Sequence, residues 1–148
     1  MRKLLLVPIL ALLNGFSLLF VQHCYADSNK VEYELQERCG NKADKWFKAE
    51  FGNGIKSDKD GLFISNYQNH YNIKLNKCLI TLTFTTLPKD KNKNSIVSKQ
   101  LFDINENKEY GSYAASTGIV KPIQCIVDGK YCNSEGEWDV LVKPFMEQ

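Results

Sequence analysis

The chain has 148 residues, with 19 Lys and Arg against 17 Asp and Glu. Arg2 and Lys3 belong to a leader of 26 residues, so the remaining 122 residues carry 17 basic and 17 acidic groups. That length is ordinary for one domain. The balanced charge excludes the strong field of one sign that binds nucleic acid or anionic lipid, so we expect no nucleic-acid partner.

The first 26 residues are typical of a secretory signal peptide. Arg2 and Lys3 precede an apolar run, residues 4–21, and small residues follow at −3 and −1 of a cleavage site after Ala26. An alternative is a membrane anchor, because a run of about 18 apolar residues can just span a bilayer. Polar residues interrupt the run and no basic cluster follows it, which favours cleavage.

We therefore predict a signal peptide at residues 1–26 and a single α+β domain at residues 27–148. The mature protein would be periplasmic or secreted, with no stable membrane anchor after cleavage.

Four cysteines follow the leader, namely Cys39, Cys78, Cys125 and Cys132. An even number in an exported chain indicates two disulfides, although their spacing alone allows three pairings. A zinc site is disfavoured because no cysteine pair has the short spacing of zinc ligands. We expect no metal and no cofactor.

A helix is predicted over residues 31–51. Leu35, Cys39, Ala43, Phe47 and Phe51 recur every four residues and form one apolar stripe. Asn29 is a plausible N-cap, and Gly52 is a natural stop. Residues 52–61 then have the composition of a loop.

Alternating apolar residues predict the strands that follow. Residues 77–86 give the strongest pattern, with Cys78, Ile80, Leu82 and Phe84 on the face expected to be core. A short strand at 62–67 would reach it through a tight connection at 68–72. Two further strands are expected at 96–104 and, less clearly, at 110–117.

Asp128-Gly129 is a hairpin signal. A two-residue loop there places Cys125 directly opposite Cys132, although in a hydrogen-bonded pair, which suits a cross-strand disulfide less well than a longer loop would. If these two pair, Cys39 pairs with Cys78.

Ser134 and Glu137 form a capping box that opens a C-terminal helix. Trp138, Leu141, Val142 and Phe145 lie on one face of this helix, and Pro144 should end or kink it in its last turn. The predicted fold is α+β: an antiparallel sheet of four to six strands, packed by the N-terminal helix and the short C-terminal one.

Two polar segments are candidate binding surfaces. One gathers Asn69, Tyr71 and Asn72 around His70, the one histidine after the leader. The other contributes Asp103, Glu106 and Tyr110. The simpler alternatives are a turn histidine that bonds backbone and a polar turn between strands. No triad, phosphate loop or paired-carboxylate pattern predicts catalytic residues.

Several short motifs resemble a group of small exported Gram-negative bacterial proteins without an assigned function. These motifs are Trp46-Phe47 after Cys39, Asn69-His70-Tyr71-Asn72 before Lys77-Cys78, Asn107-Lys108-Glu109-Tyr110-Gly111, and Cys132-Asn133-Ser134 before Trp138. The resemblance implies a periplasmic or secreted destination and no catalytic residues.

We expect an exported, non-enzymatic binding or interaction protein of the bacterial envelope, such as an inhibitor or an accessory factor, with a protein partner in the envelope or outside the cell. The alternatives are a small secreted hydrolase that uses His70 with a nearby carboxylate, and a secreted effector that acts on a host protein.

Overall fold

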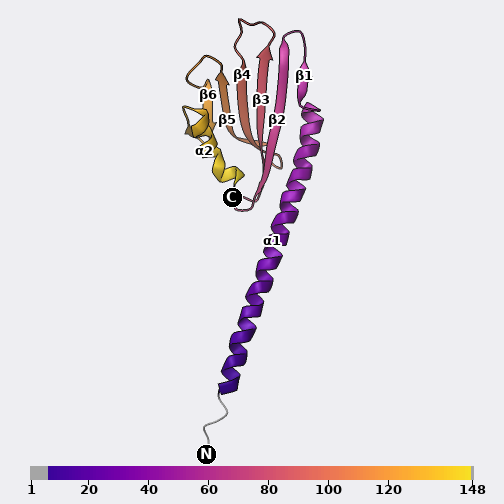
Figure 1. Ribbon diagram of the computed structural model, residues 1–148, viewed down its shortest axis with the longest axis vertical. Helices are drawn as coiled ribbons and strands as arrows, with labels where there is room; N and C mark the ends of the chain where they lie inside the picture. Colours follow the sequence, from indigo (N-terminus) through magenta and orange to yellow (C-terminus); the bar gives the residue numbers. More distant parts are fainter. Residues whose placement is uncertain (1–6, 148) are drawn as a thin grey trace, which may run out of the picture. The chain divides into compact units, whose positions relative to one another are not determined.

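The computed structural model describes the backbone of residues 7–147 and the side chains of residues 29–147 (Figure 1). The chain divides into two compact units, Met1–Leu35 and Gln36–Gln148, and helix α1 (Val7–Phe51) contributes to both. The basic residues of the leader, Arg2 and Lys3, lie outside the described residues. No helix in the described part of the chain combines the length and hydropathy that a membrane span requires.

The predicted start of the first helix at residue 31, with Asn29 as its N-cap, is wrong for the full chain, because α1 is already helical at Val7. The cause is local. Between Phe16 and Asn29 there is no Gly or Pro that would interrupt a helix.

The second unit is built on an antiparallel sheet whose strands follow one another in chain order (Figure 1). The strands are β1 (Ile55–Ser57), β2 (Gly61–Asn72), β3 (Lys77–Pro88), β4 (Ile96–Asp103), β5 (Lys108–Ser116), β6 (Gln124–Val127) and β7 (Lys130–Tyr131). The α+β class with a helix at each end is therefore confirmed. The described residues form seven strands rather than four to six, because the predicted loop at 52–61 contains the short strand β1.

Strand β2 corrects a second prediction. It continues to Asn72, so residues 68–72 are strand and not a tight connection. Asn69 pairs with Ile80 and Tyr71 with Cys78, and the turn follows at residues 73–76, where Asn76 has a φ of 53°. Pairing with the strongly patterned β3 has overridden the low strand propensity of the Asn-rich segment.

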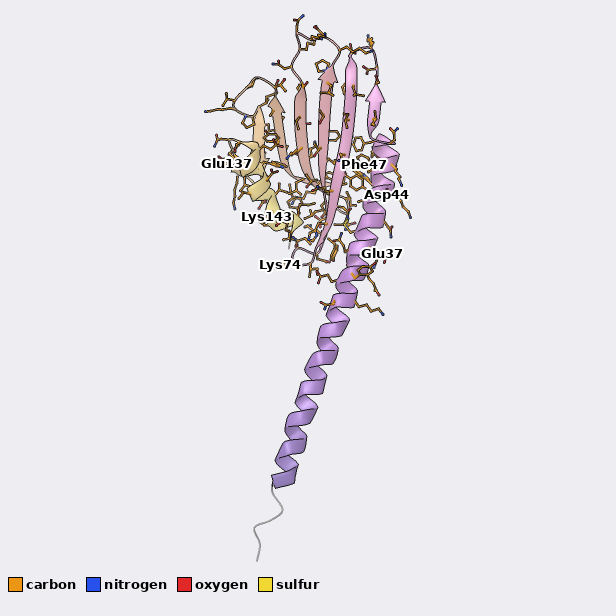
Figure 2. All side chains as sticks on the ribbon, viewed as in Figure 1. Glu37, Asp44, Phe47, Lys74, Glu137 and Lys143 are labelled. Atoms are coloured by element: carbon orange, nitrogen blue, oxygen red, sulfur yellow. A yellow bond between two sulfur atoms is a disulfide. The ribbon has the colours of Figure 1, made fainter. Side chains whose placement is uncertain are left out.

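One core lies between α1 and the sheet. Cys39, Ala43 and Phe47 on α1 pack against Cys78, Ile80 and Leu82 on β3, as the two patterns predicted. Figure 2 shows Phe47 where α1 meets the sheet. The Cys39–Cys78 disulfide crosslinks the two elements with a Cα–Cα distance of 5.4 Å, and Trp46 stacks on Phe102 at 5.8 Å between ring centroids.

A second core lies on the opposite face of the sheet, beneath α2 (Glu135–Met146). Trp138 and Val142 pack there with Leu79, Leu101 and Val127. Leu79 is therefore buried on the α2 face of β3, a core position that the alternating pattern did not predict.

The ends of α2 agree with the prediction. The Ser134 hydroxyl accepts from the Glu137 backbone N–H at 3.2 Å, and the Glu137 carboxylate accepts from the Asn133 N–H at 2.9 Å. Pro144 lies in the last turn, and the helix ends at Met146.

The hairpin between β6 and β7 has the predicted two-residue loop. Val127 pairs with Lys130, and both Asp128 and Gly129 have positive φ. Cys132 N–H donates to the Cys125 carbonyl at 3.0 Å, and the two residues form a disulfide with a Cα–Cα distance of 5.0 Å. The hydrogen-bonded position therefore accommodates the crosslink, and both predicted pairings are confirmed.

Candidate functional site

The candidate patch around His70 is divided between the two faces of the sheet. Side chains alternate along a strand, and directly paired residues share a face. His70 pairs with Leu79 and so lies on the α2 face, whereas Tyr71 pairs with Cys78 and lies on the α1 face. Asn69 lies on the α1 face too, and the strand therefore does not gather these residues into one site.

Tyr71 is held between α1 and the following turn. Its backbone N–H donates to Gln36 Oε1 at 2.7 Å, and its hydroxyl hydrogen-bonds with Asn76 Oδ1. These bonds attach the end of β2 to the helix and to its own turn.

The second candidate segment meets the first through Lys77. The Lys77 ammonium lies 3.2 Å from Asp103 Oδ2 and 2.7 Å from Glu106 Oε2. Asp103 is fully buried, and its other oxygen accepts from the Asn105 N–H at 2.8 Å. Lys77 was not among the predicted site residues, and its only signal in the sequence is its position at the start of the strongest strand.

Asn72 links the same turns to the end of α2. Its amide Nδ2 donates to the carbonyls of Pro144 and Phe145 at 3.0 and 3.1 Å. Its Oδ1 accepts from the Leu75 N–H at 2.9 Å. One buried amide therefore satisfies two carbonyls of the last helical turn, which have no partner within the helix.

Tyr110 completes this group, which we call the Lys77 cluster: Asn72, Lys77, Asp103, Glu106 and Tyr110. The Tyr110 ring lies 5.8 Å from the Phe145 ring and 4.8 Å from the Lys108 ammonium. Four of the seven predicted site residues thus come together, while Asn69, His70 and Tyr71 lie outside the cluster.

The chemistry of the Lys77 cluster is that of a structural clamp. The hydrogen bond with Glu106 raises the pKa of Lys77 well above its ordinary value, against the opposing effect of desolvation. The amine therefore stays protonated at neutral pH and is unsuited to act as a base or a nucleophile. What the cluster does is hold the β2–β3 turn, the β4–β5 turn and the end of α2 together.

A different feature has the geometry of a binding site. A cleft of about 310 Å³ lies between α2 and strands β2, β3 and β4. We call it the α2 cleft. It is lined by Asn66, Tyr67, Gln68, Thr81, Thr83, Lys99, Trp138, Asp139, Val142, Lys143, Met146 and Glu147.

The charged residues of the α2 cleft are paired with one another. Lys99 lies 2.8 Å from Glu135 and 3.1 Å from Asp139. Lys143, labelled on α2 in Figure 2, lies 3.3 Å from Glu147. Desolvation lowers the pKa of Lys99, but the hydrogen bonds with Glu135 and Asp139 outweigh it, and the pKa is raised overall.

One residue that lines the cleft contains a buried polar atom without a partner. Thr81 Oγ1 is buried and makes no hydrogen bond, the single such side-chain atom among the residues whose side chains the structure describes. A buried hydroxyl without a partner costs about 1–3 kcal/mol, so its position beside a cleft is informative.

The α2 cleft lies next to the predicted patch on the same strand. Asn66 and Gln68 are on the same face of β2 as His70, four and two positions before it. Strand alternation alone could have grouped these three residues. The cleft itself depends on where α2 lies, and no local pattern encodes that position.

Comparison with known proteins adds no relative: no protein-family model, no curated protein and no solved structure matches this chain.

Proposed function

We propose that this is an exported, non-enzymatic binding protein of the bacterial envelope, an inhibitor or an accessory factor, whose binding site is the α2 cleft. The cleft itself carries the proposal. It is concave, and apolar residues of α2 line it together with polar residues of β2 and β3, a combination that is common in ligand sites.

Export is supported by the two disulfides in the described part of the chain, because such crosslinks persist in oxidising compartments. The buried apolar core begins at Cys39, so cleavage after Ala26 would leave all of its described residues in the mature chain.

The hydrolase alternative is less well supported. His70 and Asp103 both flank Leu79 in one row of the sheet, which separates their backbones by two strand spacings, about 10 Å. Asp103 already bonds Lys77 and the Asn105 N–H. The carboxylate of that row is therefore part of the Lys77 cluster.

NMR spectroscopy of the isotope-labelled exported protein tests the proposal. Addition of envelope extract should shift resonances of residues that line the α2 cleft. Gln68→Trp, which fills the mouth of the cleft from an exposed strand position, should abolish the shifts, whereas the matched Gln124→Trp on β6 should retain them. Shifts that survive Gln68→Trp, or that fall elsewhere, would contradict the proposal.

A further inference from the structure

We infer that the ligand of the α2 cleft is a neutral, hydroxyl-rich molecule, a saccharide unit of about one ring. This inference rests on the proposed function, since it names the ligand of the same site. It follows from the charge of the cleft, its hydrogen-bonding groups and its size.

The charged residues of the cleft argue against both an anionic and a cationic ligand. The lining contains two cations, Lys99 and Lys143, and two carboxylates, Asp139 and Glu147. Lys99 also bonds Glu135, so its ammonium is already shared by two carboxylates. An anion would have to displace one of them, and a cation would have to compete with a lysine that is already in place. A neutral ligand requires neither exchange.

The remaining polar groups suit hydroxyls. The uncharged polar residues that line the cleft are Asn66 and Gln68, which carry amides, and Thr81 and Thr83, which carry hydroxyls. Amides and hydroxyls both donate and accept, as sugar hydroxyls do. Asn66 and Gln68 are exposed on the sheet face and can reach a bound molecule from the rim.

The Thr81 hydroxyl provides the most specific evidence for a ligand that carries hydroxyls. Its hydroxyl has no partner in the unliganded chain, although it belongs to the wall of the cleft. Rotation about χ1 to another staggered position can carry the hydroxyl of a threonine out of a buried position. A ligand hydroxyl at the wall would supply the missing hydrogen bond, and binding would remove the cost of the unpaired group.

Size and shape agree with this chemistry. A volume of about 310 Å³ is at the small end of the range for ligand pockets, which favours one sugar ring over a long chain. Trp138, Val142 and Met146 provide apolar lining on the α2 side, opposite the polar strand residues. A sugar ring likewise has an apolar and a polar part, with C–H groups on its faces and hydroxyls at its edge.

The test is a titration of the labelled exported protein with four sugars: glucose and N-acetylglucosamine as neutral ligands, glucuronate as an anion and glucosamine as a cation. We expect the neutral sugars to shift the cleft resonances and to bind at least about fivefold more tightly than either charged sugar. Thr81→Val should weaken neutral-sugar binding about five- to tenfold by removing one hydrogen bond. Thr86→Val, in the same strand on the other face, should leave it unchanged.

Thr83→Val provides a second lining variant should Thr81→Val lower the yield of folded protein. Co-sedimentation with chitin distinguishes the sources of the sugar. If chitin captures the protein and Gln68→Trp abolishes the capture, the ligand is a sugar unit within a polymer. If the free sugars bind but chitin does not capture the protein, the ligand is a free sugar. Either result supports the inference.

Equal or tighter binding of a charged sugar, or no neutral-sugar shift at the cleft, would overturn it. If envelope extract still shifts the cleft in a manner lost in Gln68→Trp, the binding function stands and only the ligand class fails. If extract produces no such shift, both fail.

Discussion

Asn72 is a polar residue with only 1% of its surface exposed, and its amide makes three hydrogen bonds to backbone groups. Its position beside a turn could be predicted from the sequence, because asparagine is common in turns, but its place in strand β2 could not. Its partners could not. Pro144 and Phe145 are more than 70 residues away in the chain, and only the position of α2 brings their carbonyls to the turn.

Asn72→Ala should therefore lower the free energy of unfolding by about 3 kcal/mol, since it leaves one N–H and two carbonyls without their partner. Urea denaturation measures this loss. Asn66→Ala, an exposed asparagine of the same strand, should change stability by only about 0.5 kcal/mol. Equal losses in the two variants would show that the Asn72 side chain does not link the turn to α2.

Local sequence patterns correctly predicted those helices, strands and turns whose structure depends on residues close together in the chain. The alternation of β3, the Asp128-Gly129 hairpin and the Ser134 cap each depend on residues close in sequence, and each is confirmed. The second half of β2 was missed because its strand conformation depends on pairing with β3. The α2 cleft was missed for a related reason, since it forms only where α2 crosses the sheet.

The two disulfides differ in the length of chain that they close. Cys39–Cys78 spans 39 residues, whereas Cys125–Cys132 spans 7. In the loop-entropy model, the first contributes about 4 kcal/mol and the second about 2.5 kcal/mol.

Replacement of Cys39 and Cys78 together by Ser should therefore destabilise the protein by more than replacement of Cys125 and Cys132 together, by about 1.4 kcal/mol in this model. Parallel urea denaturation of the two double variants makes the comparison. A larger loss in the variant without the Cys125–Cys132 crosslink would mean that hairpin geometry, and not chain entropy, dominates.

For the molecule as a whole, stability should decline at alkaline pH. The Glu106 hydrogen bond raises the pKa of Lys77, and burial raises the pKa of Tyr113 above its ordinary value of 10.0. The pKa of Lys99 is raised as well. A group with a higher pKa in the folded state holds more protons there than in the unfolded chain. The free energy of unfolding therefore falls as pH rises through the window above the ordinary pKa.

We expect the free energy of unfolding to fall above about pH 10, where these groups begin to titrate in the unfolded chain. Tyr113→Phe keeps the ring that packs near Trp138 but removes the ionisable hydroxyl. The free energy of unfolding of this variant should therefore decline less steeply with pH than that of the unmodified protein. Urea denaturation from pH 8 to about pH 11.5 follows both proteins. A steeper decline in the variant would contradict the assigned sign.

The order of the strands also determines how the chain can fold as it is made. Each strand from β2 to β7 pairs with the strand made just before it, so a chain that emerges from its N-terminus can extend the sheet one hairpin at a time. Such neighbouring contacts have short closure distances and favour rapid folding. Trp138 and the other core residues of α2 come last in the chain, which leaves the second face of the growing sheet open to water until the C-terminal helix has been made.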